Sequence, residues 1–234
     1  MDHEKGINAN LQPFCPARAY GEIRYSSGNC IYYSPASGGG SRFDYVHHQR
    51  TLRLNDLVGK GWTFYPANSG FRVQFRRDGQ TLAQPEIHFS IVSSEGVPGL
   101  STEELSIFAA LHEVGHAILH ETLYQTLREE GHYFGEEGHY FGADDSYTQQ
   151  LVETLGYFSR QNRDFRKYDE RFAWRFALAL RTQHELFPTT SQEDLDRFYL
   201  RQLGSYGADF LNPRWDQFQG NVDPWENVKR RFRF

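Results

Sequence analysis

The segment from residue 101 to residue 127 constrains the fold more than any other part of the chain. It contains no proline and no run of glycines, and Ser101 is followed three residues later by Glu104, the pattern of a capping box at a helix N-terminus. Apolar residues recur with the spacing of one helical face, at Leu105, Phe108, Ala109, Leu111, Ile118, Leu119 and Leu123. The sequence therefore predicts a long helix that is buried in the middle of a domain.

This helix carries the sequence His112-Glu113-Val114-Gly115-His116. Residues four apart lie on one helical face, so the imidazoles of His112 and His116 can bind one zinc ion. Glu113 lies beside them and can accept a proton from a zinc-bound water instead of binding the metal. Without a metal, burial of two imidazoles and a carboxylate costs free energy unless each finds a partner. We therefore expect a catalytic Zn²⁺ site with Glu113 as its general base.

The composition fits one globular domain, or a domain with appendages. The chain has 234 residues, of which 38% are hydrophobic, and its net charge of −5 argues against a nucleic-acid partner. No segment approaches the roughly 18 apolar residues of a membrane span, and the N-terminus lacks the apolar core of a signal peptide. We expect a protein that is cytoplasmic or is delivered by a signal-independent route. Cys15 and Cys30 could form one disulfide, which leaves the redox compartment open.

The chain divides into a polar arm at residues 1–20, a domain at residues 21–211 and an aromatic, basic tail at residues 212–234. Period-two patterns before the helix predict strands at residues 22–25, 30–33, 62–65, 71–76 and 86–91. A small antiparallel sheet would thus lead directly into the helix. The last of these strands can reach residue 92. Residues 86–92 form either the edge of a cleft, where an extended substrate would pair with the strand, or an interior strand.

The part after the helix is predicted to be helical. The seven residues 129–135 are repeated at 136–142, and the four glycines of this repeat predict a loop, which is either a tolerated duplication or a mobile lid. Further helices are predicted at residues 151–158, 169–186 and 192–203. The predicted fold class is therefore α+β, with a small N-terminal sheet followed by a helical half.

A catalytic zinc site needs a third protein ligand and an open position. His120 lies eight residues beyond His112, which is about 12 Å along a straight helix at 1.5 Å per residue, so these two cannot share an ion. We expect His120 to support a ligand or to lie in the core. The acidic residues that remain as candidates for the third ligand are Asp144, Asp145, Glu153 and Glu170.

The stretch at residues 112–120, HEVGHAILH, resembles the His-Glu-Leu-Gly-His-Ala-Leu-Leu-His helix of the ImmA/IrrE-type metallopeptidases, which are zincins. In that family a later helix with the pattern Glu-x-x-Ala-x-x-Phe-Ala supplies the third zinc ligand. This chain has Glu-Arg-Phe-Ala-Trp-Arg-Phe-Ala at residues 170–177, so the resemblance implies a zincin-like fold with Glu170 as the ligand. The small Ala173 and Ala177 would let that helix approach the zinc helix closely.

A second resemblance gives a different third ligand. Residues 142–147 resemble the Gly-Thr-x-Asp loop of the aspzincins, which implies Asp145. Glu153 remains a further candidate, so the third ligand is open among Glu170, Asp145 and Glu153.

These patterns predict a zinc-dependent metallopeptidase. Zinc would acidify its bound water and polarise the scissile carbonyl, while Glu113 would move a proton from that water to the leaving amine. The expected substrate is a protein or peptide that is cleaved in a limited way. The protease would be either a regulator in its own cell or a delivered toxin or effector. The alternatives are an interaction module that keeps zinc without turnover and an enzyme that hydrolyses a non-peptide amide. The oxyanion donor is predicted among Tyr133, Tyr140, Tyr147, Tyr157, Tyr168, His132 and His139.

Overall fold

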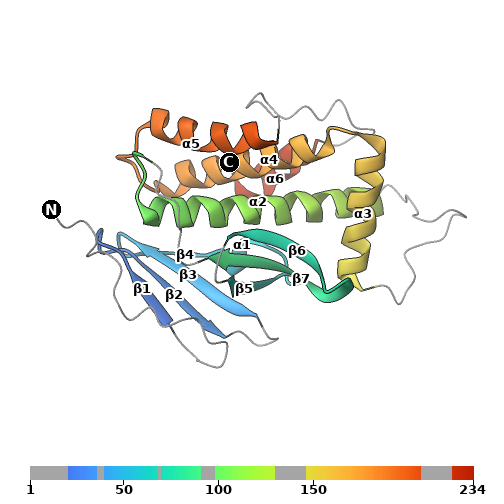
Figure 1. Ribbon diagram of the computed structural model, residues 1–234, viewed down its shortest axis with the longest axis horizontal. Helices are drawn as coiled ribbons and strands as arrows, with labels where there is room; N and C mark the ends of the chain where they lie inside the picture. Colours follow the sequence, from blue (N-terminus) through green and yellow to red (C-terminus); the bar gives the residue numbers. More distant parts are fainter. Residues whose placement is uncertain (1–20, 36–39, 68–69, 91–97, 130–145, 207–222) are drawn as a thin grey trace, which may run out of the picture.

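The computed structural model describes residues 21–35, 40–67, 70–90, 98–129, 146–206 and 223–234. Its N-terminal half forms a curled sheet and its C-terminal half is helical, which confirms the α+β fold class (Figure 1). The strands are β1 (Gly21–Arg24), β2 (Cys30–Pro35), β3 (Ser41–His47), β4 (Arg50–Arg53), β5 (Thr63–Ala67), β6 (Arg72–Arg77) and β7 (Gln80–Ser90). The short helix α1 (Leu54–Leu57) follows β4.

The sheet is mixed, so the prediction of an antiparallel sheet is wrong. Its described strands follow the order β1-β2-β3-β5-β7-β6, with β4 also paired to β3, and β5 pairs with β7 in parallel. The reason lies in the hairpin of β6 and β7. After β5 the chain crosses to the edge to form β6, turns at Asp78 and Gly79, and returns as β7 between β5 and β6. Because β7 reverses the direction of β6, it runs parallel to β5.

This order decides between the two interpretations of the strand before the helix that carries His112 and His116. β7 covers most of residues 86–92 and is an interior strand, hydrogen-bonded to β5 on one side and β6 on the other. β6 is the edge strand on this side of the described sheet. Its Val73 and Phe75 pack against the core, whereas Arg72 and Arg76 are exposed. The alternation predicts which side chains face inward, but the strand order depends on pairing between distant segments.

The helical half is built around one central helix. The helices are α2 (Thr102–Glu129), α3 (Tyr147–Gln161), α4 (Phe165–His184), α5 (Gln192–Ser205) and α6 (Pro224–Phe232). Figure 1 shows α2 lying along the sheet, with α4 and α5 on its other side and α3 running across one end. The three helices predicted after α2 are all present. No helix in the described ranges is long and apolar enough to cross a membrane.

α2 begins at the predicted capping box and is buried along most of its length. The N–H of Ser101 donates to Oε2 of Glu104 at 2.7 Å, and the N–H of Glu104 donates to Oγ of Ser101 at 3.2 Å. Both the capping box and the burial of this helix are therefore confirmed. The apolar side chains that α2 contributes to the core include Leu105, Ile107, Phe108, Leu111, Ile118, Leu119 and Leu123.

α2 and α4 approach each other closely at two small residues. A Cβ atom added to Gly115 would lie 2.7 Å from the backbone Cα and O of Ala173, nearer than real Cβ contacts allow. Ala177, one turn further along α4, is fully buried. The expected close contact through the alanine face of α4 is thus present, and it brings polar residues of the two helices within reach of each other.

The described part of the C-terminal tail belongs to the same core. On α6, Trp225 and Val228 are buried, and the ring of Phe232 packs edge-on against Phe176 of α4 with centroids 5.1 Å apart. Arg231 donates to the carboxylate of Glu121 at 3.0 Å and so links α6 to α2. Cys30 is buried in β2, whereas Cys15 lies outside the described residues.

Candidate metal centre

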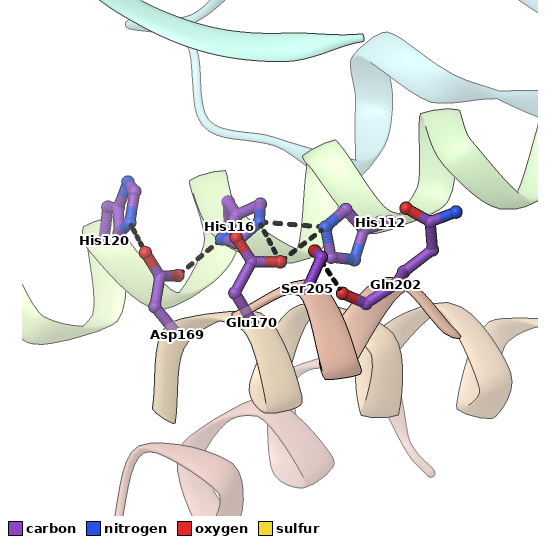
Figure 2. A network of polar contacts seen from close by, with 7 residues as sticks. All are labelled: His112, His116, His120, Asp169, Glu170, Gln202 and Ser205. Atoms are coloured by element: carbon purple, nitrogen blue, oxygen red, sulfur yellow. Dashed lines mark hydrogen bonds and ion pairs between the residues drawn. The ribbon is translucent and has the colours of Figure 1, made fainter. Parts of the chain in front are cut away.

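Three ligand atoms from α2 and α4 converge at the place where the helices are closest. Nε2 of His112 lies 3.0 Å from Nε2 of His116, and Oε2 of Glu170 lies 3.2 Å and 3.7 Å from these two nitrogens. Figure 2 shows the three side chains pointing at one another. All three residues are buried, with exposed fractions of 7–8%.

These separations fit one zinc ion. Ligand atoms bound at about 2.0–2.1 Å with tetrahedral angles are about 3.3 Å apart, and the three observed distances bracket that value. The donor set of two imidazoles and one carboxylate is a usual one for catalytic zinc, and it leaves a fourth position open. Two neutral imidazole nitrogens that face each other at 3.0 Å repel unless a cation or a proton lies between them. The residues present therefore fit Zn²⁺.

The other candidates for the third ligand are placed differently. Glu153 lies on α3, where its carboxylate accepts a hydrogen bond from Gln149 at 2.8 Å. Asp144 and Asp145 lie outside the described residues, as does the repeat from residue 130 onward. Among the described candidates, the structure brings Glu170 to the two histidines and leaves Glu153 apart from them.

A second polar group adjoins the first and shares His116 with it. Asp169 places Oδ1 2.5 Å from Nδ1 of His116 and Oδ2 3.1 Å from Nε2 of His120 (Figure 2). This group also combines two histidines with a carboxylate, but 2.5 Å is a hydrogen-bond distance and is too short for two ligand atoms on one ion. The expectation that His120 supports a ligand thus has a geometric basis, because it contacts the carboxylate that holds His116.

The side chains of the centre shift one another's pKa values so that the two carboxylates stay ionised. Burial alone would raise the pKa of Asp169, but His116 and His120 outweigh it and hold that pKa well below its ordinary value. Burial would likewise raise the pKa of Glu170, whereas hydrogen bonds from His112 and His116 lower it to about 2. For His116 burial acts to lower the pKa, but the charge of Asp169 raises it well above the ordinary value.

Glu113 differs from the other buried acidic residues of α2. Glu103 accepts hydrogen bonds from Ser27, Asn29 and Tyr45. Glu121 accepts hydrogen bonds from the backbone N–H of Gly59 and from Arg231. Glu113 is also buried, at 9% exposed, yet it makes no hydrogen bond or ion pair with any residue in the described ranges. Its negative charge still acts on His116, so it lies close to the candidate ligands.

Sequence reasoning missed three residues of this centre. Asp169 precedes Glu170, and this adjacent pair of acidic residues was the available signal. Trp174 lies one turn after Glu170, and its ring centroid is 4.3 Å from that of His112. Tyr206, at the C-terminal end of α5, was overlooked because it follows the last predicted helix. Burial and then the negative charge of Glu170 raise its pKa, so this hydroxyl lies beside the candidate ligand.

The tyrosines that the sequence suggested as oxyanion donors are found elsewhere or are not described. Tyr147 packs edge-on against Tyr124, with ring centroids 5.7 Å apart, and Tyr157 packs in the same way against Phe158. Tyr168 is buried, and Asp223 is the largest electrostatic influence on its hydroxyl. The remaining candidates, His132, Tyr133, His139 and Tyr140, lie outside the described residues.

We compared the chain with models of protein families, with curated proteins and with solved structures. None of the three comparisons found a match.

Proposed function

We propose that this protein is a zinc-dependent metallopeptidase in which His112, His116 and Glu170 bind the ion and Glu113 is the general base. The observation that carries the proposal is the convergence of two Nε2 atoms and one carboxylate oxygen at separations of 3.0, 3.2 and 3.7 Å. The unpartnered carboxylate of Glu113 beside them supports an enzyme over an interaction module, because a module needs no buried base. The zincin-like fold and the relationship to ImmA/IrrE-type peptidases belong to this proposal.

In this proposal the metal, Glu113 and Glu170 have separate roles in the reaction. A bound zinc ion supplies Lewis acidity, which polarises a carbonyl and acidifies water. Glu113 accepts the proton of the attacking water and passes it to the leaving amine, because its carboxylate has no other partner in the described structure. Glu170 stays ionised in this scheme, since its pKa is lowered to about 2.

Tyr206 is the residue that we propose as the donor to the oxyanion. Its hydroxyl lies beside the Glu170 carboxylate, and the guanidinium of Arg166 lies 4.8 Å from the centre of its ring. A tyrosine hydroxyl keeps its proton at neutral pH and can donate a hydrogen bond, and burial raises the pKa of Tyr206 further.

An extended substrate would add to β6, the edge strand, instead of to the interior strand β7. β6 lies near the metal centre, because the ring of Phe75 is 5.7 Å from that of His120. The exposed Arg72 and Arg76 on this strand would favour acidic side chains in the substrate.

The test combines zinc content with proteolysis. The purified protein should hold one zinc ion per chain and should cleave a protein substrate, and a chelator should abolish the cleavage. Because specificity for one target would hide activity on a generic substrate, new N-termini should also be compared across a proteome treated with wild-type protein or with Glu113→Gln. Stoichiometric zinc without any new N-terminus would identify an interaction module. Release of ammonia or an amine from small amides would identify an amidohydrolase.

A further inference from the structure

We propose that Asp169 is the positioning residue of the metal centre: its carboxylate, anchored by His120, fixes the ring of His116 so that Nε2 faces the ion. This inference deepens the proposed function and rests on it, since it assumes that His116 is a ligand. Asp169 would not touch the metal or the substrate and would act through His116.

The hydrogen-bond pattern fixes which nitrogen of His116 faces the ligands. An ionised carboxylate only accepts hydrogen bonds, so the nitrogen 2.5 Å from Oδ1 of Asp169 must be the one that carries the proton, and this is Nδ1. The other nitrogen, Nε2, then has a free lone pair, and it is the atom that lies 3.0 Å from His112 and 3.7 Å from Glu170. A carboxylate behind a ligating histidine also makes the imidazole a stronger base towards the metal.

His120 holds the carboxylate itself in place. Its Nε2 lies 3.1 Å from the second oxygen of Asp169, so both carboxylate oxygens have a histidine partner. Its ring lies 5.7 Å from that of Phe75 on β6, and its side chain is 5% exposed. His120 is thus buried between Asp169 of α4 and Phe75 of β6. This contact explains how a histidine two turns beyond His112 can contribute to the centre without binding the ion.

The two histidine ligands are held in different ways. Nδ1 of His112 is buried and has no hydrogen-bond partner in the described structure, and its ring is fixed by packing against Trp174 at a centroid distance of 4.3 Å. Trp174 is itself packed against Phe198 and Tyr199 of α5. Of the two histidines, only His116 has a carboxylate against its Nδ1, the nitrogen that faces away from the proposed ion. Removal of the Asp169 charge should therefore weaken one identifiable ligand and leave the other unchanged.

The experiment compares metal binding by purified variants. Zinc affinity would be measured by competition with a chromogenic chelator, and the visible absorption spectrum of the cobalt(II) form would report the coordination geometry. Asp169→Asn keeps the shape of the side chain but has neither the negative charge nor a second acceptor oxygen. We expect its zinc affinity to fall about 10- to 100-fold, the usual effect of losing such a partner, and its cobalt spectrum to change. Glu170→Gln should bind zinc more weakly still.

The controls separate positioning from folding and from net charge. Asp164→Asn removes one negative charge from the start of α4, where Asp164 pairs with Lys167 at the surface, and should leave zinc affinity and the cobalt spectrum unchanged. His120→Gln should lower zinc affinity less than Asp169→Asn does, and it tests the same chain of contacts if Asp169→Asn does not fold. Circular dichroism of the metal-free variants shows whether each one is folded.

Each outcome has a defined meaning. Wild-type zinc affinity and an unchanged cobalt spectrum in Asp169→Asn would overturn the positioning role alone. Equal losses in Asp164→Asn and Asp169→Asn would also overturn it, because the cause would then be net charge. Zinc binding by the wild type without any proteolysis would refute the peptidase and leave the role of Asp169 intact. A wild-type protein that binds neither zinc nor cobalt would refute both proposals.

Discussion

The buried acidic residues of α2 differ in how their carboxylates are hydrogen-bonded. Glu103 and Glu121 each accept at least two hydrogen bonds, which offset the cost of taking a carboxylate out of solvent. Glu113, which is 9% exposed, has no such bonds in the described structure. A carboxylate that lies beside candidate metal ligands and is not bound by neighbouring side chains is typical of a functional position.

The first prediction concerns Glu113. Glu113→Gln should keep the fold and the zinc but lose at least about 10²-fold in kcat, because an amide cannot take the proton of the attacking water. Zinc content and kcat would be measured on the same preparation. Glu153→Gln makes the same chemical change on α3 and should have wild-type activity. Loss of zinc from Glu113→Gln, or full activity, would contradict the assignment of a general base.

The second prediction concerns the hydroxyl of Tyr206. Tyr206→Phe should lower kcat about 10²- to 10³-fold, as the removal of one oxyanion donor commonly does, and should leave zinc affinity near the wild-type value. Tyr199→Phe removes a hydroxyl from the same helix, one that donates to Asp196, and should have little effect on kcat. A change in KM alone would instead indicate that Tyr206 contacts substrate only in the ground state.

Sequence reasoning could find the residues that lie close together along the chain. His112, Glu113 and His116 lie within about one turn of the same helix, so their relative positions follow from helix geometry alone. The partners from α4 and α5 depend on how helices dock, which no local spacing encodes. Glu170 was therefore one of several candidates, and Asp169 and Tyr206 were missed, although the structure places both beside the candidate ligands.

Among the elements, the contact of α2 with α4 determines whether the proposed metal centre can form. Glu170 and Ala173 lie on one face of α4, and Gly115 lies between the two histidines on α2. The distance between the helices at Gly115 therefore also sets the distance from Glu170 to the histidines. Small residues at this contact matter for the centre as much as its ligands do.

The third prediction tests this contact. Gly115→Ala should gain about 1 kcal/mol of helix propensity but should also push against the backbone of Ala173, and such overpacking costs about 1–3 kcal/mol. We expect a net loss of stability in chemical denaturation together with weaker zinc binding, because α4 would be displaced. Gly204→Ala on α5 meets open space and should be neutral or stabilising. Stabilisation by Gly115→Ala with unchanged zinc affinity would show that the contact is not tight.

The sheet shows which features of an element the sequence can predict. Alternation along Arg72–Arg77 correctly indicates that Val73 and Phe75 face inward, since period two is a local property. The parallel pairing of β5 with β7 depends on the insertion of β7 between β5 and β6. That insertion joins segments about twenty residues apart, which is why the antiparallel prediction was wrong.

At the scale of the whole molecule, the proposed metal centre joins the two helices that hold the domain together. α2 packs against the sheet, against α4 and against α6, while α4 carries Glu170 and packs against α5 (Figure 1). A metal ion held by His112, His116 and Glu170 would cross-link α2 to α4. Ligand binding to the folded state alone stabilises it by mass action, so the metal should stabilise the entire fold.

The last prediction follows from this linkage. Free zinc at 100 times its Kd should stabilise the protein by about 2.7 kcal/mol, which corresponds to a rise in Tm of about 5–11 °C for a chain of this length. The measurement is thermal unfolding with and without zinc, followed by reversal with a chelator. Glu113→Gln should keep the full rise in Tm, because its carboxylate is not a ligand, whereas Glu170→Ala should lose most of it. Glu153→Ala and Asp145→Ala complete the comparison, since both were candidates for the third ligand. If Asp145→Ala lost the rise while Glu170→Ala kept it, the third ligand would be Asp145, and the aspzincin-like arrangement would replace the one proposed here.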